Sequence, residues 1–301
     1  MKVPNKVKVV EVAPRDGLQN EKMTIPVATK VELVNRLARA GLANVEAVSF
    51  VSPKWVPQMA DGAQVMAQIQ RQAGTIYSAL TPNMRGFEDA RTAGIDEVVI
   101  FGAASEAFSQ KNINCSIAES IARFEPVAQA AKDAGIRLRG SISCALDCPY
   151  EGPTPAEAVA DVVRRMLDLG CDEIDIADTI GTGTPLRVER VMKTVTELAD
   201  PAIFSGHFHD TYGQALANIL ASLQVGISIF HSSVAGLGGC PYAKGATGNV
   251  ATENVLYMLH GMGIETGVDL DAVVDTGQWI AAQLGRRADS LAGNALTARK
   301  A

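Results

Sequence analysis

The chain has 301 residues, of which 47% are hydrophobic and 20% are charged, and its formal net charge is −6. This is the composition of an ordinary globular protein. The negative charge argues against a nucleic-acid or membrane-surface partner, because both need a positive face. No apolar run reaches the roughly 18 residues that span a bilayer, and the start of the chain has no apolar block typical of a secretory signal.

The cysteines indicate a reducing environment. There are five of them, an odd number in a long chain, so a disulfide framework is not expected. Cys144 and Cys148 lie four residues apart, but no second Cys or His pair completes a zinc ribbon. Reduced thiols fit a cytoplasmic protein, and the start of the chain does not have the Ser/Arg-rich composition of a transit peptide.

Short β-branched segments alternate with longer amphipathic segments along the chain. Glycines follow the ends of several helical patterns, as at Gly41, Gly94, Gly135, Gly170 and Gly226, and mark helix stops. The predicted strands are 7–11, 44–48, 75–80, 97–101, 137–143, 173–177, 203–208 and 228–232. The predicted helices between them are 29–40, 61–72 (followed by Gly74), 84–93, 117–134, 155–169, 185–198 and 214–224.

Strict alternation of strands and helices predicts an α/β fold with a parallel sheet and right-handed crossovers. Eight such units favour closure into a (β/α)8 TIM barrel. The Gly-x-Gly-x-x-Gly fingerprint is absent after the first strand, which argues against a dinucleotide-binding sheet. We expect residues 1–301 to form a single barrel catalytic domain, with 269–301 as an appended tail of C-terminal helices.

Chemically reactive side chains gather where the predicted strands end. In a barrel of this kind the active site forms at the carboxyl ends of the strands. The side chains that fall there are those of Arg15, Asp16, Glu46, Ser49, Asp178, Thr179, His207, His209, Asn249 and Glu253. We therefore expect them to share one site.

His207 and His209 form the sharpest pair of candidate metal ligands. In an extended segment, residues i and i+2 point the same way, so two imidazoles can reach one ion. Asp16 supplies a carboxylate from the first strand, and Asn249 can add a neutral oxygen. This set favours Mg²⁺ or Mn²⁺, and Zn²⁺ is the alternative. A core histidine beside a surface histidine is the non-functional interpretation.

Arg15 adjoins the carboxylate ligand and can hold a substrate oxygen on which negative charge develops. Glu46 and Asp178 are carboxylates inside the predicted barrel, where acids are rarely buried without a partner. Both are candidate catalytic groups. A purely structural ion pair with Arg15 is the alternative for each of them.

The segment 233–242, SVAGLGGCPY, places Cys240 in a glycine-rich loop after the last predicted strand. Glycines let a backbone bend sharply and approach a ligand closely, whereas a structural cysteine is normally buried and inert. We expect Cys240 to do chemistry. A glycine-rich turn that happens to contain a cysteine is the alternative.

These residues together resemble the 3-hydroxy-3-methylglutaryl-CoA lyase family over nearly the whole chain. The resemblance is carried by VAPRDGLQNE (12–21), FVSPKWVPQMAD (50–61), NINCS (112–116), DTIG (178–181), HDTYGQALAN (209–218) and the Cys240 loop. The Cys240 loop is the most specific of these segments. Isopropylmalate and homocitrate synthases share the Arg-Asp-Gly and His-x-His motifs. The family has Gly in many members where this chain has Ala177.

The resemblance implies a metal-dependent cleavage of an acyl-CoA thioester to acetyl-CoA and acetoacetate, a retro-Claisen step of leucine degradation. Asp178 or a water beside it is expected to act as the base, with His207 as a possible contributor, and Cys240 to deliver a proton. The implied metal ligands are Asp16, His207, His209 and Asn249. The implied catalytic residues are Arg15, Glu46, Asp178, His207 and Cys240, supported by Glu253. The expected substrate-binding residues are Arg15, Gln19, Ser49 and Thr179.

Three other functions remain as alternatives. A synthase that condenses acetyl-CoA with a 2-oxo acid uses the same metal set, but such enzymes usually carry further domains. A lyase for a longer 3-alkyl homologue of the substrate is a second alternative, because one methylene in a pocket changes the preference between two substrates by only about 1–3 kcal/mol. A non-catalytic scaffold would leave the clustered acids, histidines and Arg15 without a chemical reason. We expect a homo-oligomer, with a dimer favoured.

Overall fold

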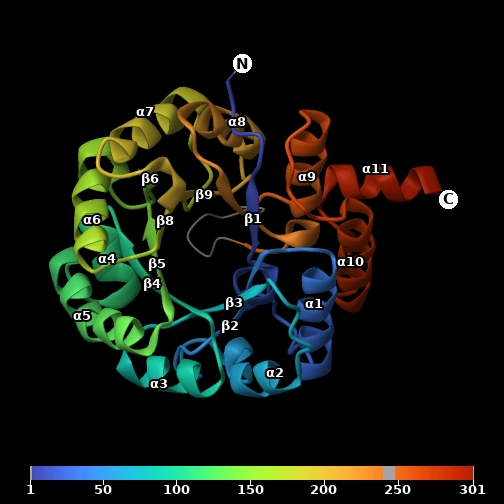
Figure 1. Cartoon of the computed structure of the whole chain (residues 1–301), viewed down its shortest axis with the longest axis horizontal. Helices are drawn as coiled ribbons and strands as arrows, with labels where there is room; N and C mark the ends of the chain where they lie inside the picture. The colour runs from blue at the N-terminus through green and yellow to red at the C-terminus, as the bar shows by residue number, and fades with distance from the viewer. Residues whose placement is uncertain (1, 240–247, 301) are drawn as a thin grey trace.

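The computed structural model describes residues 2–239 and 248–300 and contains a closed barrel of eight parallel strands (Figure 1). The order around the barrel is β1-β10-β9-β8-β5-β4-β3-β2. The strands are β1 (Lys8–Glu11), β2 (Asn44–Ser49), β3 (Ile76–Leu80), β4 (Glu97–Ala103), β5 (Arg137–Ser143), β8 (Glu173–Asp178), β9 (Phe204–Phe208) and β10 (Ile229–Ser232). The expected (β/α)8 barrel is therefore confirmed.

A ring of helices surrounds the barrel (Figure 1). These helices cover the outer face of the sheet, so β2 and β8 are buried along their whole length, as is usual for parallel strands between helices and a packed interior. The ring contains α1 (Val27–Arg39), α2 (Gly62–Gln68), α3 (Met84–Thr92), α4 (Glu106–Ile113), α5 (Ile117–Ala134), α6 (Ala156–Asp168), α7 (Pro185–Thr196), α8 (Ala215–Val225) and α9 (Thr252–Gly261).

The longest helix, α5, shows how local chemistry sets the ends of an element. Ser116 accepts a hydrogen bond from the Glu119 amide at 3.1 Å, and the Glu119 carboxylate accepts one from the Ser116 amide at 2.8 Å. This reciprocal capping box satisfies two backbone donors at the helix start. The helix ends at Gly135, whose φ of 65° lies in the left-handed region, where glycine carries no steric penalty.

Three helical features differ from the sequence-based expectation, and one of them is α9 (Thr252–Gly261), which no predicted helix covers. The predicted helix 61–72 ends at Gln68, because Ile69 is extended and the next amide, Gln70 N, donates to the Asn35 side chain at 2.7 Å. A contact from a distant helix therefore replaces the helical hydrogen bonds. The short helix α4 (Glu106–Ile113) was not predicted, although Ser105 caps its start by accepting a hydrogen bond from Phe108 N. A two-stranded hairpin, β6 (Asp147–Cys148) with β7 (Gly152–Pro153), also precedes α6.

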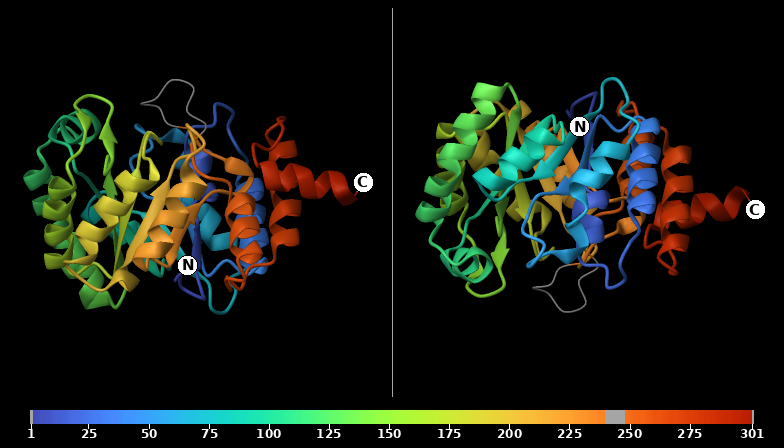
Figure 2. Two further views of the ribbon diagram at one scale, coloured as in Figure 1. Left: turned by 90° about the horizontal axis from the view of Figure 1, so that it is seen from above. Right: turned by 90° about the horizontal axis from the view of Figure 1, so that it is seen from below.

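Two further helices follow α9, namely α10 (Leu270–Gln283) and α11 (Leu291–Lys300). The helix α10 packs beside α1 on the outside of the barrel. Figure 2 shows that α11 projects away from the barrel in both views. No helix in the described part of the chain is long and apolar enough to cross a membrane.

The interior of the barrel is unusually polar. Arg139 of β5 is fully buried, and so are Glu97 of β4 and Glu173 of β8. Barrel interiors are normally filled with branched apolar side chains. Buried charges need partners, and these groups lie in one network of ion pairs that continues into the carboxyl end of the barrel.

Candidate active site

The first strand ends in a π-helical turn, η1 (Ala13–Gly17), that carries Arg15 and Asp16. The amide of Gly17 returns to the carbonyl of Val12 at 3.2 Å, which closes this wide turn. A side chain at position 17 would come within 2.9 Å of Leu237 Cβ, so glycine is needed for the close approach of the two segments. Such turns are frequent at functional sites.

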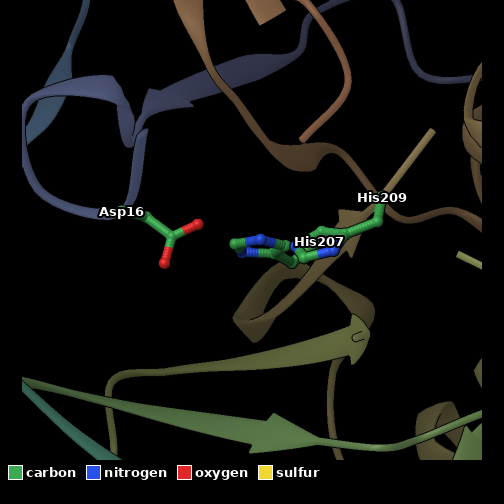
Figure 3. A group of neighbouring side chains, drawn as sticks. All are labelled: Asp16, His207 and His209. Atoms are coloured by element: carbon green, nitrogen blue, oxygen red, sulfur yellow. The ribbon is translucent and has the colours of Figure 1, made fainter. Parts of the chain in front are cut away.

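Three predicted metal ligands converge at the end of β9. His207 is in the strand and His209 follows it, and Figure 3 shows the Asp16 carboxylate facing their imidazole rings. The three residues offer ligand atoms that all lie within 4.8 Å of one another. His207 and His209 are each 8% exposed. The i and i+2 spacing thus brings both rings to one place, as the sequence predicted.

Asn249, the fourth predicted ligand, bridges this cluster. Its side-chain oxygen lies 2.8 Å from His207 Nε2, and its side-chain nitrogen donates to Asp16 Oδ2 at 2.7 Å. Gly238 makes room for it, because a Cβ there would lie 2.8 Å from Asn249 Nδ2. All four predicted ligands therefore form one contiguous set.

The donor set fits a divalent cation. Burial lowers the pKa of His207, and it lowers that of His209 to about 4, so both imidazoles are neutral at pH 7 and their lone pairs are available. Burial alone would raise the pKa of Asp16, but Arg15 and the two imidazoles outweigh it and hold that pKa far below its usual value. His209 Nδ1 is buried and has no hydrogen-bond partner among the described atoms.

Arg15 is held between two carboxylates. Its Nη1 donates to Asp16 Oδ1 at 2.7 Å, and its Nε pairs with Glu46 Oε1. Glu46 in turn pairs with Arg139. Burial opposes ionisation of Glu46, but the two guanidinium groups outweigh it and lower the Glu46 pKa. The ion pair between Glu46 and Arg15, expected as one alternative, is therefore present.

Asp178 ends β8 in a different environment. Its Oδ2 accepts a hydrogen bond from Gly183 N at 2.8 Å, whereas its Oδ1 is buried without a partner among the described atoms. Burial raises the pKa of Asp178 to about 6, and the Gly183 and Thr182 amides only partly oppose this. A carboxyl group with a pKa near neutrality can exchange protons at physiological pH.

The other predicted substrate-binding residues lie at the ends of three different strands. Gln19 follows η1, and its Oε1 is buried without a described partner. Ser49 ends β2 and borders a cavity of 960 Å³ between α2 and α3. Thr179 follows β8, and its hydroxyl accepts a hydrogen bond from Cys144 N at 2.7 Å. The roles of these three residues remain predictions.

Cys240, predicted as a catalytic residue, lies outside the described residues. The segment before it begins with η4 (Val234–Gly236), and Gly239 O accepts a hydrogen bond from Asn20 Nδ2 at 3.0 Å. A cavity of 370 Å³ lies at this junction. Its lining includes the charged side chains of Glu21, Lys22 and Arg286, and Glu21 pairs with Arg286 at 2.6 Å.

Glu253, predicted as a supporting residue, lies at the start of α9. Its two carboxylate oxygens accept from Ala235 N at 3.0 and 3.1 Å, and Ala235 has a φ of 60°. Burial raises the pKa of Glu253 to about 8. Glu253 thus contacts η4 rather than the metal-ligand set.

The sequence did not reveal two buried neighbours of the site. His231 of β10 lies with its Nδ1 3.3 Å from His207 Nδ1, and its Nε2 lies 3.1 Å from Arg139 Nη1. Both residues fall inside predicted strands rather than at strand ends, so position alone gave no signal. The one available indication was a charged residue, Arg139, in a strand whose other residues are typical of a buried strand.

Comparisons with known proteins agree with the resemblance found in the sequence. The HMGL-like family model matches residues 6–280. A Pseudomonas aeruginosa protein named 3-hydroxy-3-isohexenylglutaryl-CoA/hydroxy-methylglutaryl-CoA lyase is 56% identical, over 99% of this chain and 100% of its own. The mitochondrial hydroxymethylglutaryl-CoA lyase of Rattus norvegicus is 54% identical, over 96% and 89% respectively.

A solved structure gives the same result in three dimensions. The crystal structure of hydroxymethylglutaryl-CoA lyase from Pseudomonas aeruginosa superimposes with a TM-score of 0.98 and 56% identity, and covers 99% of this chain and 100% of that one. The match therefore includes the barrel and the helices that follow it. On this evidence the chain belongs to the HMGL-like family.

Proposed function

We propose that the protein cleaves 3-hydroxy-3-methylglutaryl-CoA to acetyl-CoA and acetoacetate. The observation that carries this proposal is the convergence of Asp16, His207 and His209 on one point next to the partly buried guanidinium of Arg15. Two relatives with lyase names match 96–99% of the chain at 54–56% identity. A synthase or a scaffold is not needed to account for these side chains.

Asp16, His207, His209 and Asn249 would hold a divalent cation. Two imidazoles with carboxylate and amide oxygens favour Mg²⁺ or Mn²⁺, and the mixed nitrogen and oxygen set leaves Zn²⁺ as the second choice. Such an ion would orient the tertiary hydroxyl of the substrate and make it more acidic.

Asp178 suits the role of base. Its unpartnered Oδ1 and its raised pKa allow it to take the hydroxyl proton. The C3 oxygen then forms the ketone of acetoacetate while the C2–C3 bond breaks, and the electron pair of that bond passes to the thioester as an enolate. A proton delivered to C2 completes acetyl-CoA, and we propose Cys240 as its donor.

We propose that Arg15 stabilises the enolate oxygen. Glu46 and Asp16 fix its guanidinium from two sides, so little reorganisation is needed when charge develops. Glu46 thereby acts through Arg15. We propose that Gln19, Ser49 and Thr179 contact the acyl portion of the substrate.

The coenzyme A portion suits the cavity beside η1. Coenzyme A carries phosphate groups, and Lys22 and Arg286 border that cavity. Cationic side chains favour phosphate binding through charge-assisted hydrogen bonds. Glu21 also lines the cavity and pairs with Arg286 at 2.6 Å, so a phosphate there would have to share that guanidinium with the carboxylate. The acyl-CoA substrate would therefore lie with its phosphates outside the barrel and its acyl group at the metal ligands.

We also propose a single catalytic domain that includes the tail 269–301, a homodimer and a cytoplasmic location. Helices α9 and α11 pack against each other, and each carries one exposed large apolar side chain, Tyr257 (58%) and Leu291 (79%). Burial of these side chains in a subunit interface would remove them from water. Cys115, Cys148 and Cys171 are buried free thiols, which fits a reducing compartment. Light scattering after size exclusion measures the dimer directly.

A thioester-cleavage assay with and without chelator tests the proposed function. We expect release of acetyl-CoA and acetoacetate, its loss in EDTA, and its recovery with Mg²⁺ or Mn²⁺. If the protein supplied with Mg²⁺ or Mn²⁺ released no acetyl-CoA, the lyase assignment would be overturned. Full turnover of the metal-stripped protein would overturn the metal assignment alone.

A longer 3-alkyl substrate is a second candidate, because the Pseudomonas aeruginosa relative is named for both isohexenyl and methyl substrates. The same assay separates the two when both thioesters are compared at equal concentration. A higher kcat/KM for the isohexenyl compound would assign the longer chain.

A further inference from the structure

A fully buried carboxyl group ends the first strand and has no part in the proposed chemistry. Glu11 is inaccessible to solvent and lies two residues before η1. A buried acid is costly unless its oxygens are hydrogen-bonded. The partners of Glu11 therefore explain why a carboxyl group occupies this position.

Glu11 accepts hydrogen bonds from three separate segments of the chain. Its Oε1 accepts from Ala13 N at 2.9 Å and from Val234 N at 3.0 Å. Its Oε2 accepts from Thr252 Oγ1 at 2.7 Å. The contacts with Val234 and Thr252 reach 223 and 241 positions along the sequence, so no local structure could make these two.

Each of the three segments leads to a residue of the site. Ala13 begins η1, which carries Arg15 and Asp16. Val234 begins η4, and the next residue beyond η4, Leu237, accepts through its carbonyl from Asn249 Nδ2 at 3.3 Å. Thr252 begins α9, three positions after Asn249. The Glu11 carboxyl group thus fixes the backbone segments that carry the anionic ligand Asp16 and the neutral ligand Asn249.

We propose that Glu11 is a positioning residue that sets the distance between the Asp16 and Asn249 ligands of the divalent cation. The inference rests on the metal site of the proposed function. Glu11 acts through its hydrogen bonds to the three segments, and the nearest metal ligand in sequence, Asp16, is five residues away. It predicts that the acceptor atoms of residue 11, and not its negative charge, are what the site needs.

The hydrogen-bond pattern allows glutamine to replace Glu11. An amide oxygen can accept from both backbone N–H groups, while the amide nitrogen donates to Thr252 Oγ1. The Thr252 hydroxyl can then donate to Ser232 Oγ, 2.8 Å away, because either hydroxyl of that pair can be the donor. Burial also raises the pKa of Glu11 to about 7, so the native carboxyl is already neutral part of the time.

Leucine has a similar volume but no acceptor. It would leave the buried N–H groups of Ala13 and Val234 unpaired, whereas the Thr252 hydroxyl would keep only its Ser232 partner. The test compares Glu11→Leu with Glu11→Gln in the full chain. Asn35→Leu is the matched control, because it removes a buried acceptor of a backbone N–H, from Gln70, on the outer helix α1. Thr252→Val removes a single contact to Glu11 and serves if Glu11→Leu does not fold.

Two measurements are made on each variant. Isothermal titration with Mn²⁺ gives the metal affinity, and hydrogen exchange of the metal-free protein, read by mass spectrometry, reports the amides of 12–17 and 233–239. We expect Glu11→Leu to weaken Mn²⁺ binding about 10–100-fold, the usual effect of losing a support behind the ligands, and to speed exchange in both segments. Thr252→Val should have a smaller effect in the same direction.

Glu11→Gln and Asn35→Leu should bind Mn²⁺ as tightly as the wild type, within about twofold. Wild-type affinity and exchange in Glu11→Leu, or in Thr252→Val if the former does not fold, would overturn the inference. So would a Glu11→Gln variant as impaired as Glu11→Leu, because the negative charge would then be what matters. If the wild type itself does not bind Mn²⁺, the proposed metal site fails. The role of Glu11 is then tested by hydrogen exchange alone, and unchanged exchange in Glu11→Leu would show that Glu11 does not hold the two segments in place.

Discussion

Asp178 gives the sharpest physical test of the site, through the substitution Asp178→Asn. The carboxyl group is 1% exposed, and burial raises its pKa from 3.8 to about 6. Asparagine has nearly the same shape and retains an oxygen that can accept from Gly183 N. The substitution therefore removes the ionisation of this residue while leaving the local packing in place.

The magnitude follows from the difference in pKa between the folded and unfolded states. Between pH 3.8 and about 6 the folded state holds a proton on Asp178 that the unfolded state has lost, so stability falls as the pH rises. Above that window the folded state bears the full penalty of a buried charge, about 3 kcal/mol for a difference of roughly two pKa units. Below pH 3.8 this residue contributes nothing to the pH dependence.

Urea unfolding of metal-free wild type and Asp178→Asn at pH 4 and pH 8 measures this penalty. About 0.6 kcal/mol of the penalty is already present at pH 4, so the free energy of unfolding of the variant, relative to the wild type, should increase by about 2.4 kcal/mol between the two pH values. Other titrating groups affect both proteins and cancel in the difference. The same relative stability at both pH values would refute the raised pKa and, with it, the physical basis for Asp178 as the base.

Three further outcomes follow from the site. Arg15→Met should lower kcat by about 10²–10³, the usual loss for a group that contacts developing charge, with a smaller change in KM; steady-state kinetics with a normal kcat and a raised KM would contradict this. His209→Ala should weaken Mn²⁺ binding in a calorimetric titration without lowering the Tm of the metal-free protein. Cys240→Ser should turn over more slowly at unchanged Mn²⁺ affinity, because a hydroxyl is a weaker acid than a thiol with a usual pKa of about 8.5; wild-type turnover would place the proton donor elsewhere.

Local patterns in the sequence are enough to predict the architecture. Strand β5 was predicted at 137–143 and spans Arg137–Ser143, and the other seven barrel strands lie within a few residues of their predicted positions. Short β-branched segments followed by amphipathic helices with glycine stops give a strong local signal. A closed barrel then follows, because eight parallel units must bury both faces of their sheet.

The sequence also determined which residues gather at the carboxyl end of the barrel. Asp16 and His207 are 191 positions apart, yet their places at strand ends were enough to predict that they meet. This inference succeeds because a barrel brings all its strand ends to one face. It requires only the strand boundaries and no detail of packing.

Which of these groups form ion pairs depends on packing between distant segments. Arg15 could pair with Glu46 or with Asp178, and the barrel places it against Glu46. Asp178 receives backbone amides instead and acquires a raised pKa. Burial and the distance to the nearest charge set these properties, and neither can be read from local sequence.

The same limit applies to the groups behind the site. Glu11 reads in the sequence as one more residue of a short strand, yet in the structure its carboxyl group joins segments 223 and 241 positions away. Helix α2 ends early for the same reason, because a distant side chain, Asn35, takes the amide of Gln70. Local patterns specify elements because neighbouring residues share one backbone, whereas hydrogen bonds between distant segments exist only after the chain has folded.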